Sequence, residues 1–264
     1  MAEAIRRDAA TVVLLRDRRG SGPGDSGLEV LLMARPASAR FAAGAEVFPG
    51  GTVEPSDRDP SWSEVSAGPL SDQRLELGIL VAAVRECFEE SGVLLARDAG
   101  GGLCRRSQVA ALAELRRRIH DRRPEEFREG LLGAGLRPAW EDLVYCAHWV
   151  TPEGLPRIFD TRFFLAALPL DQEPLADELG ELDSLRWVGP AQAMAEAIRG
   201  DCLLLPPTRA VLEQLTVQPT VAAALAAAAK REVGRVQPPL EEITEARYPG
   251  LDPRTIFRAH RGEG

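Results

Sequence analysis

Three glutamates and an arginine crowd into six consecutive positions of the chain, in the stretch VRECFEESGV that ends at Val93. On a helix, Glu86, Glu89 and Glu90 stand at positions i, i+3 and i+4, so their carboxylates share one face. Like charges at this spacing destabilise a helix by roughly 0.2–0.5 kcal/mol per pair. Carboxylate oxygens are also the ligands that hard divalent cations such as Mg²⁺ and Mn²⁺ prefer. The pattern therefore indicates either a divalent metal site or, as for most glutamate pairs, a solvated acidic surface.

The sequence around the glutamates predicts the elements that would position them. Apolar residues recur every three or four positions over 73–91, which is helical spacing, and Gly92 follows where a helix-ending glycine belongs. An apolar face opposite the carboxylates predicts that this helix packs against a core. Gly50 and Gly51 form a turn that could fold the chain back toward the acidic face. Arg85 could orient one carboxylate through a bidentate pair.

Strand-like and helical patterns alternate along the rest of the chain. Short apolar runs typical of strands occupy 11–15, 29–35, 143–150, 161–168 and 185–188. A second helix is predicted over 107–121, a short third one follows it, and three more helical segments lie after position 190. The last of these is rich in alanine and could be an interface in a homodimer or a cap on the fold.

Composition excludes several classes of protein. The 264 residues are 45 % hydrophobic and 27 % charged, with a formal net charge of -8. Binding to nucleic acid in general rests on many Lys and Arg contacts to phosphates, so we expect no nucleic-acid partner. Four scattered cysteines without a CxxC pair are typical of reduced thiols in a cytoplasm. Because no run reaches about 18 apolar residues and no signal-peptide pattern is present, we expect a cytoplasmic protein without a membrane span.

Two stretches, GGTVE and RECFEESGV, together resemble the signature of Nudix hydrolases. Gly51 is similar to the first glycine of that signature, and the stretch from Arg85 to Val93 matches its second half at every position. The resemblance implies an α/β fold, a Nudix-type α/β/α sandwich with a mixed sheet. It also implies that Mg²⁺ or Mn²⁺ is held by the three glutamates, with a backbone carbonyl of Gly50 or Gly51 completing the coordination.

The first half of the signature departs from the family pattern. The family has a compact loop with a glutamate eight positions before the arginine, and this chain has Leu77 at that place. Glu76, one position earlier, is the substitute that we consider. An insertion at about 55–72 lengthens the loop, and we expect it to leave the carboxylates undisturbed.

A second likeness lies upstream of the signature. The stretch LLMARPASARFAAGAEVFPGG is similar to the segment that distinguishes the coenzyme A diphosphatase branch of the family. This resemblance implies that its arginines, Arg35 and Arg40, meet phosphate oxygens of the substrate, and Gly50 and Glu54 are assigned to the same site. The alternative is a strand that runs into a turn with two solvated arginines. Farther on, TPEGLPRIFDTRFFLA and LLLPPTRAVLEQL are similar to segments of the peroxisomal acyl-coenzyme A members.

The activity that the resemblance implies is hydrolysis of the diphosphate of coenzyme A or an acyl-coenzyme A, giving 3′-phosphoadenosine 5′-phosphate and (acyl-)4′-phosphopantetheine. Glu89 or Glu90 is the expected general base, with Arg85 in the same catalytic group. Glu178, Arg157 and Arg162 are weaker candidates, because each also fits an ordinary surface charge. The nearby aromatic residues are interpreted as core rather than as a surface for stacking an adenine; they are Phe159, Phe163 and Phe164.

Two other functions stay open at this point. A Nudix hydrolase could act on another nucleoside diphosphate derivative, such as ADP-ribose, a dinucleotide or a nucleotide sugar, and the fold alone does not separate these substrates. A non-catalytic Nudix-like domain could instead bind a nucleotide as a sensor, although such domains are expected to lose signature glutamates. In each case we expect one domain over 1–264, with a helical insertion at about 105–135 and a C-terminal helical extension at about 190–264.

Overall fold

A mixed sheet forms the centre of the protein. The computed structural model describes residues 4–18, 27–36, 42–65, 75–175, 184–244 and 248. In these ranges a nine-stranded sheet has the order β10-β3-β2-β1-β8-β7-β11, while β4 pairs with β1 and β9 pairs with β2. Its strands are β1 (Ile5–Asp17), β2 (Leu28–Ala34), β3 (Ala45–Val47), β4 (Gly50–Thr52), β7 (Val144–Val150), β8 (Arg157–Ala167), β9 (Ser184–Val188), β10 (Leu203–Leu204) and β11 (Arg235–Val236). A separate pair consists of β5 (Ala96–Arg97) and β6 (Arg137–Pro138).

Strand β1 organises the sheet because it pairs with three others. It runs parallel to β8 along most of its length and antiparallel to both β2 and β4, which share its other edge. Successive side chains of a strand point to opposite faces, so β1 contributes to two cores. Val12 and Leu14 belong to the core on one face, and Val13 and Leu15 belong to the core on the other.

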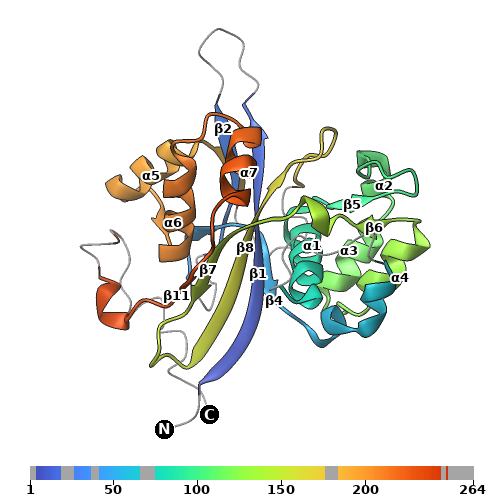
Figure 1. The fold of residues 1–264 in the computed structure, drawn as a ribbon, viewed down its shortest axis with the longest axis horizontal. Helices are drawn as coiled ribbons and strands as arrows, with labels where there is room; N and C mark the ends of the chain where they lie inside the picture. The colour runs from blue at the N-terminus through green and yellow to red at the C-terminus, as the bar shows by residue number, and fades with distance from the viewer. Residues whose placement is uncertain are drawn as a thin grey trace.

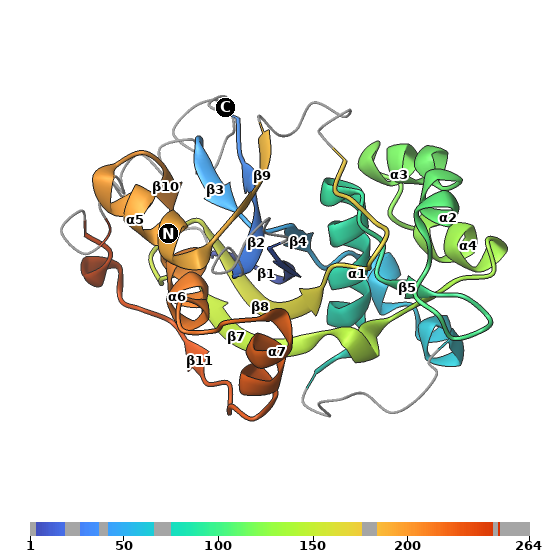
Figure 2. The same cartoon turned by 90° about the horizontal axis from the view of Figure 1, so that it is seen from above.

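Helices cover both faces of this sheet. Figures 1 and 2 show the helices from the middle of the chain on one side and the C-terminal helices on the other. The first group is α1 (Leu77–Ser91), α2 (Arg106–Ala110), α3 (Ala113–His120) and α4 (Glu126–Gly133). The second group is α5 (Pro190–Arg199), α6 (Pro206–Leu215) and α7 (Val221–Ala229). Four short 3₁₀ turns are η1 (Pro55–Arg58), η2 (Pro60–Val65), η3 (Trp140–Asp142) and η4 (Leu240–Glu242). This layering confirms the predicted α/β fold with a mixed sheet.

Helix α1 carries the glutamates and packs directly on β1 and β4. Its apolar face is buried in the core, and it ends at Gly92, whose φ of 71° is the left-handed conformation that glycine adopts without strain. The guanidinium of Arg116, which is 4 % exposed, donates hydrogen bonds to the carbonyls of Phe88, Glu89 and Glu90. The carbonyl of Phe88 also accepts a hydrogen bond from the N–H of Gly92, and the last carbonyls of a helix lack partners in a following turn, so Arg116 stabilises the end of α1 next to the acidic face.

Three features differ from the pattern expected from sequence. The helix predicted over 107–121 is divided into α2 and α3. The part of the insertion that the structure describes is packed rather than loose, because Trp62 of η2 is 2 % exposed and its ring lies against Phe127 and Trp140. The region after position 190 also supplies two strands, β10 and β11, which extend the sheet at its two ends. None of the helices in the described ranges has the length and apolarity that crossing a membrane requires.

Candidate functional site

Two of the three glutamates of α1, Glu86 and Glu90, lie against the glycines of β4. The N–H of Gly50 donates a hydrogen bond of 2.7 Å to Oε2 of Glu90. A Cβ atom built on Gly51 would lie 2.5 Å from Oε1 of Glu86, so only glycine leaves room for this carboxylate. At Gly50 a Cβ would lie 2.5 Å from the carbonyl oxygen of Ala10 on β1. The two glycines therefore bring the backbone of β4 into direct contact with the acidic face of the helix.

Arg85 fixes the orientation of two of the three carboxylates. Its Nη1 donates to Glu86 at 2.8 Å and to Glu89 at 3.3 Å, while Nη2 donates to the carbonyl of Thr52 at 3.0 Å. The side chain is 2 % exposed. Burial by itself lowers the pKa of Arg85, but the hydrogen bonds to Asp57 and the charges of the glutamates outweigh this effect and raise it. Arg85 therefore stays charged and ties α1 to the end of β4.

Asp57, which was not among the residues singled out from sequence, is the acidic partner of Arg85. Its two carboxylate oxygens accept hydrogen bonds from Nε and Nη2 of Arg85 at 2.9 and 2.8 Å, and its side chain is 2 % exposed. Asp57 lies six positions after Gly51, at the start of the insertion, so counting forward from the glycine would have found it. Counting eight positions backward from Arg85 leads instead to Leu77, whose neighbour is Glu76.

That neighbour, Glu76, lies away from the acidic face. It immediately precedes α1, its side chain is 68 % exposed, and its carboxylate pairs with Arg58 at 3.4 Å. Ten residues of helix rise separate it from Glu86, which is about 15 Å along the axis. Glu54 lies closer to the site: its Oε1 accepts a hydrogen bond from the hydroxyl of Thr52, and its N–H donates to Asp57. We therefore do not include Glu76 in the proposed site.

Burial changes the acidity of the carboxylates. Loss of hydration raises the pKa of Glu86 to about 7, against the opposing charge of Arg85. Burial, together with the charge of Glu86, raises the pKa of Glu90 well above its usual value, although the N–H of Gly50 counteracts this. In the protein alone, the positive charge near Glu86 and Glu90 is therefore too small to offset the cost of burying both carboxylates in the ionised form.

The donor set fits a hard divalent cation. Glu86, Glu89 and Glu90 offer carboxylate oxygens, and a cation would stabilise the ionised forms that burial disfavours. Within the described ranges, however, no three His, Cys, Asp or Glu side chains are arranged so that they could hold a metal ion by themselves. Magnesium sites that also bind phosphates rarely need a complete cage of side chains, because one or two carboxylates, waters and substrate oxygens share the coordination.

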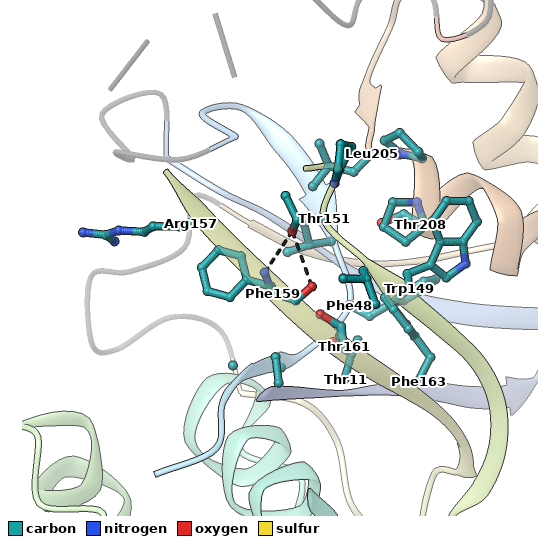
Figure 3. A pocket seen from close by; sticks show the side chains of 18 of the residues that line it. Thr11, Phe48, Trp149, Thr151, Arg157, Phe159, Thr161, Phe163, Leu205 and Thr208 are labelled. Atoms are coloured by element: carbon teal, nitrogen blue, oxygen red, sulfur yellow. Dashed lines mark hydrogen bonds between the residues drawn. The ribbon is translucent and has the colours of Figure 1, made fainter. Parts of the chain in front are cut away.

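A cavity of about 430 Å³ opens beside β4 (Figure 3). Gly50, Gly51 and Thr52 line it, and so does Arg35 from the end of β2. The charge of Arg35 acts on Glu90 and opposes the rise in its pKa. The cavity thus borders the strand that holds the carboxylates and contains one of the two arginines assigned to the substrate. The other, Arg40, lies outside the described residues.

A second, polar cavity of about 550 Å³ borders the same carboxylates. Its lining includes His120 at the end of α3 and Arg122 in the turn that follows, together with Glu54, Arg85, Glu86 and Glu89. Nδ1 of His120 lies 4.0 Å from Oε1 of Glu89. The acidic face of α1 is therefore accessible from a cavity that the helical insertion helps to build.

The weaker sequence candidates are spread over the molecule. Arg157, at the start of β8, is exposed and lies at the rim of the 430 Å³ cavity, where Figure 3 shows its side chain extending away from the aromatic rings. Arg162 is paired with Asp8 at 2.8 Å and Asp160 at 2.7 Å and does not line that cavity. We therefore omit Arg162 from the proposed substrate site. Glu178 lies outside the described residues.

The interpretation of the aromatic residues as core is confirmed for Phe164 and Phe163, since Phe163 is 5 % exposed and belongs to the core on the other face of the sheet, but not for Phe159. Phe164 is fully buried in the core on the α1 side. Phe159 and Phe163 point to the other face of β8 and line the 430 Å³ cavity, where Phe48 and Trp149 join them. The alternation of side chains along a strand predicts that Phe159 and Phe163 share one face of β8 and that Phe164 points to the other.

Replacing Gly51 with alanine should lower the rate of hydrolysis by about 10- to 100-fold. A displacement of about 1 Å in the active site can reduce the rate by about 100-fold. The new methyl group would occupy the space of the Glu86 carboxylate and displace it. Steady-state kinetics of Gly51→Ala would be compared with those of Gly133→Ala, where no atom lies within 4 Å of the added Cβ. Equal rates for the two variants would contradict the close approach of Gly51 and Glu86.

In EDTA, Glu86 should make the protein less stable as the pH rises from about 4.5 to about 7. Its pKa in the folded protein is about 7 against an ordinary 4.5, so the folded state binds more protons than the unfolded chain in this window. The stability that Glu86 contributes below pH 4.5 is therefore lost as the pH passes 7, by up to about 3 kcal/mol. Glu86→Gln should abolish the loss, because the amide stays neutral.

Urea unfolding of both proteins at pH 5 and pH 8 tests this dependence. At pH 8 the free energy of unfolding of the glutamine variant should rise relative to that of the unmodified protein. Added Mg²⁺ should increase the free energy of unfolding of the unmodified protein only, because a cation binds the ionised carboxylate. An unchanged difference between the two proteins at both pH values would contradict the raised pKa.

The comparisons with known proteins agree with this geometry. The family model described as the NUDT19 Nudix domain matches residues 71–215, more than half of the chain. The chain is similar to the acyl-coenzyme A diphosphatase NUDT19 of Homo sapiens, with 28 % identity over 226 residues that cover 70 % of this chain and 60 % of that protein. The protein of the same name from Gallus gallus is 28 % identical over 250 residues, covering 76 % of this chain and 65 % of the relative.

A solved structure shows the same fold. The crystal structure of a NUDIX hydrolase from Alicyclobacillus acidocaldarius matches with a TM-score of 0.68 and 28 % identity, covering 85 % of this chain and 97 % of that one. The chain spans less than two thirds of the length of the curated relatives described above. On the matched family model, the shared fold and the helix that carries the three glutamates, the chain belongs to the Nudix hydrolase family.

Proposed function

We propose that the chain is a metal-dependent pyrophosphohydrolase that cleaves the diphosphate of coenzyme A or an acyl-coenzyme A. The products are 3′-phosphoadenosine 5′-phosphate and (acyl-)4′-phosphopantetheine. The observation that carries the proposal is the contact of the α1 carboxylates with Gly50 and Gly51, which line a cavity containing Arg35. The names of the similar NUDT19 proteins support the choice of substrate.

Nudix hydrolases generally use divalent metal ions. We propose that Glu86, Glu89 and Glu90, with the carbonyl of Gly51, hold Mg²⁺ or Mn²⁺ here. Such an ion supplies charge neutralisation at the phosphate oxygens and a lowered pKa for a bound water. The other substrate contacts in the proposal are Arg35, Arg40, Gly50 and Glu54.

The side chains of the chain itself position the reacting groups. Arg85 orients Glu86 and Glu89, and the N–H of Gly50 holds Glu90, so the carboxylates are fixed before substrate arrives. Glu89 or Glu90 accepts the proton of the attacking water. The positive charge of Arg35 attracts the diphosphate to the end of the cavity that borders β4.

Hydrolysis of coenzyme A, an acyl-coenzyme A and ADP-ribose, assayed in parallel with Mg²⁺, tests the substrate. Mass spectrometry of products formed in ¹⁸O-water would show which phosphorus takes up the oxygen. We expect a clear preference for the coenzyme A compounds. A higher kcat/KM for ADP-ribose would reject the substrate and leave the family assignment intact.

A further inference from the structure

The 430 Å³ cavity has aromatic walls built from distant parts of the chain. Phe159 and Phe163 come from β8, Trp149 from β7 and Phe48 from the turn between β3 and β4. Figure 3 shows the rings of Phe159 and Trp149 on different sides of the cavity, with threonine side chains between them. Its volume falls in the range of sites for small molecules.

The charge of the lining suits an anionic ligand. Arg35 and Arg157 are its charged residues, and no aspartate or glutamate is among the described residues that line it. The polar cavity on the other side of the carboxylates differs, because four glutamates line it as well as two arginines and a histidine; they are Glu54, Glu86, Glu89, Glu125, Arg85, Arg122 and His120. Of these two cavities, the first therefore offers the more favourable surroundings to an anionic group with an aromatic body.

The backbone that carries Phe159 is fixed before any ligand binds. The N–H of Phe159 donates to the hydroxyl oxygen of Thr151 at 3.0 Å, and the N–H of Thr151 donates to the carbonyl of Phe159 at 3.0 Å (Figure 3). Because Thr151 directly follows Trp149 and Val150 on β7, these bonds also set the position of Phe159 relative to the Trp149 segment. A preorganised pair of rings loses little conformational entropy on binding a flat group.

Strand β4 lies between the cavity and two of the carboxylates. Gly50 and Gly51 line the cavity on one side and contact the carboxylates of Glu90 and Glu86 on the other. A substrate whose diphosphate lies beside Gly50 and Gly51 can therefore place one of its two substituents in this cavity. For coenzyme A this is either the 3′-phosphoadenosine half, with a planar base and an extra phosphate, or the uncharged and flexible pantetheine arm.

We propose that the cavity binds the 3′-phosphoadenosine half of the substrate, with the adenine against Phe159 and Trp149. This inference rests on the proposed function. Flat rings favour a planar base by stacking, and an arginine-containing lining without carboxylates favours the half that carries more phosphate. Phe159 and Trp149 are then specificity-determining residues, and the pantetheine arm leaves the site outside this cavity.

Calorimetric binding of each product half to the full chain tests the proposal. The probes are 3′-phosphoadenosine 5′-phosphate and 4′-phosphopantetheine, and the variants are Phe159→Leu and Trp149→Leu, which keep bulk but remove the ring. Each variant should bind 3′-phosphoadenosine 5′-phosphate about 10- to 100-fold more weakly, with unchanged affinity for 4′-phosphopantetheine. Trp187→Leu is the matched control, because Trp187 lies against Arg16 and does not line the cavity.

The outcomes separate this inference from the proposed function. Weaker binding of 4′-phosphopantetheine, equal weakening of both halves, or no change in either would overturn the assignment of the cavity. Melting temperatures of the two variants show whether a loss arises from unfolding, and agreement between two rings from different strands guards against a local defect. If the unmodified chain hydrolyses no coenzyme A compound, the proposed function fails, and the nucleotide-binding measurement still reports on the cavity by itself.

Discussion

Glu90→Gln lowers kcat for hydrolysis of the diphosphate by about 10³-fold, the expected effect of losing a general base or an essential charge. Glutamine keeps the size of the side chain, and its amide oxygen can still accept the hydrogen bond from Gly50. Since burial already favours the neutral form of Glu90, the variant should fold at least as stably in EDTA as the unmodified protein. Steady-state kinetics with Mg²⁺ and thermal unfolding measure the two effects.

The control for this variant is Glu76→Gln, at the far end of the same helix. Glu76 is exposed and removed from the acidic face, so its replacement should leave kcat unchanged. A Glu90→Gln enzyme that keeps kcat within about threefold of the unmodified protein would exclude the acidic face of α1 as the catalytic centre. The same result would favour the alternative function, a non-catalytic domain that only binds nucleotides.

Asp57→Ala destabilises the protein by about 3–5 kcal/mol, because it leaves the charge of Arg85 buried without its bidentate partner. The two side chains are each 2 % exposed, and Asp57 accepts two of the hydrogen bonds that Arg85 donates. Urea unfolding in EDTA gives the free energy of unfolding. Asp57→Asn should lose less, since the amide oxygen can still accept one bond.

The matched control is Glu64→Ala in the same insertion. The side chain of Glu64 is 77 % exposed, and its partner Arg128 lies 3.9 Å away. This variant should therefore have the same free energy of unfolding as the unmodified protein. If Asp57→Ala were as stable as Glu64→Ala, Arg85 would have to be neutral or held in another way. The insertion would then be a simple loop rather than part of the support for the acidic face.

Local patterns in the sequence were sufficient for the parts of the site that lie within one element. The spacing of Glu86, Glu89 and Glu90 predicts a shared helical face, and the structure places all three on α1, with Glu86 and Glu90 beside Gly51 and Gly50. The end of the helix at Gly92 follows from the same periodicity. These predictions succeed because the distance between neighbours on a helix depends only on their separation along the chain.

The partner of Arg85 and the walls of the cavity depended on tertiary structure. Asp57 lies 28 positions before Arg85, and an insertion of irregular sequence separates them, so helical spacing carries no information about their contact. The cavity combines side chains from β1, β3, β7, β8 and α6 with Pro238 and Ile243 near the C-terminal end of the described chain. Strand pairing decided this arrangement, because the register of β8 on β1 and β7 sets which rings face the cavity.

The sequence by itself therefore determined the shared helical face of the three glutamates, the family and the alternation of strands and helices. The tertiary structure alone decided that Asp57 replaces Glu76 beside Arg85, that Phe159 and Phe163 line a cavity, and that the chain after position 190 returns to the sheet as β10 and β11. The physical reason is the range of the interactions. Periodicity and capping act within a few residues, whereas ion pairs and cavity walls form between segments that only the packing of the whole chain brings together.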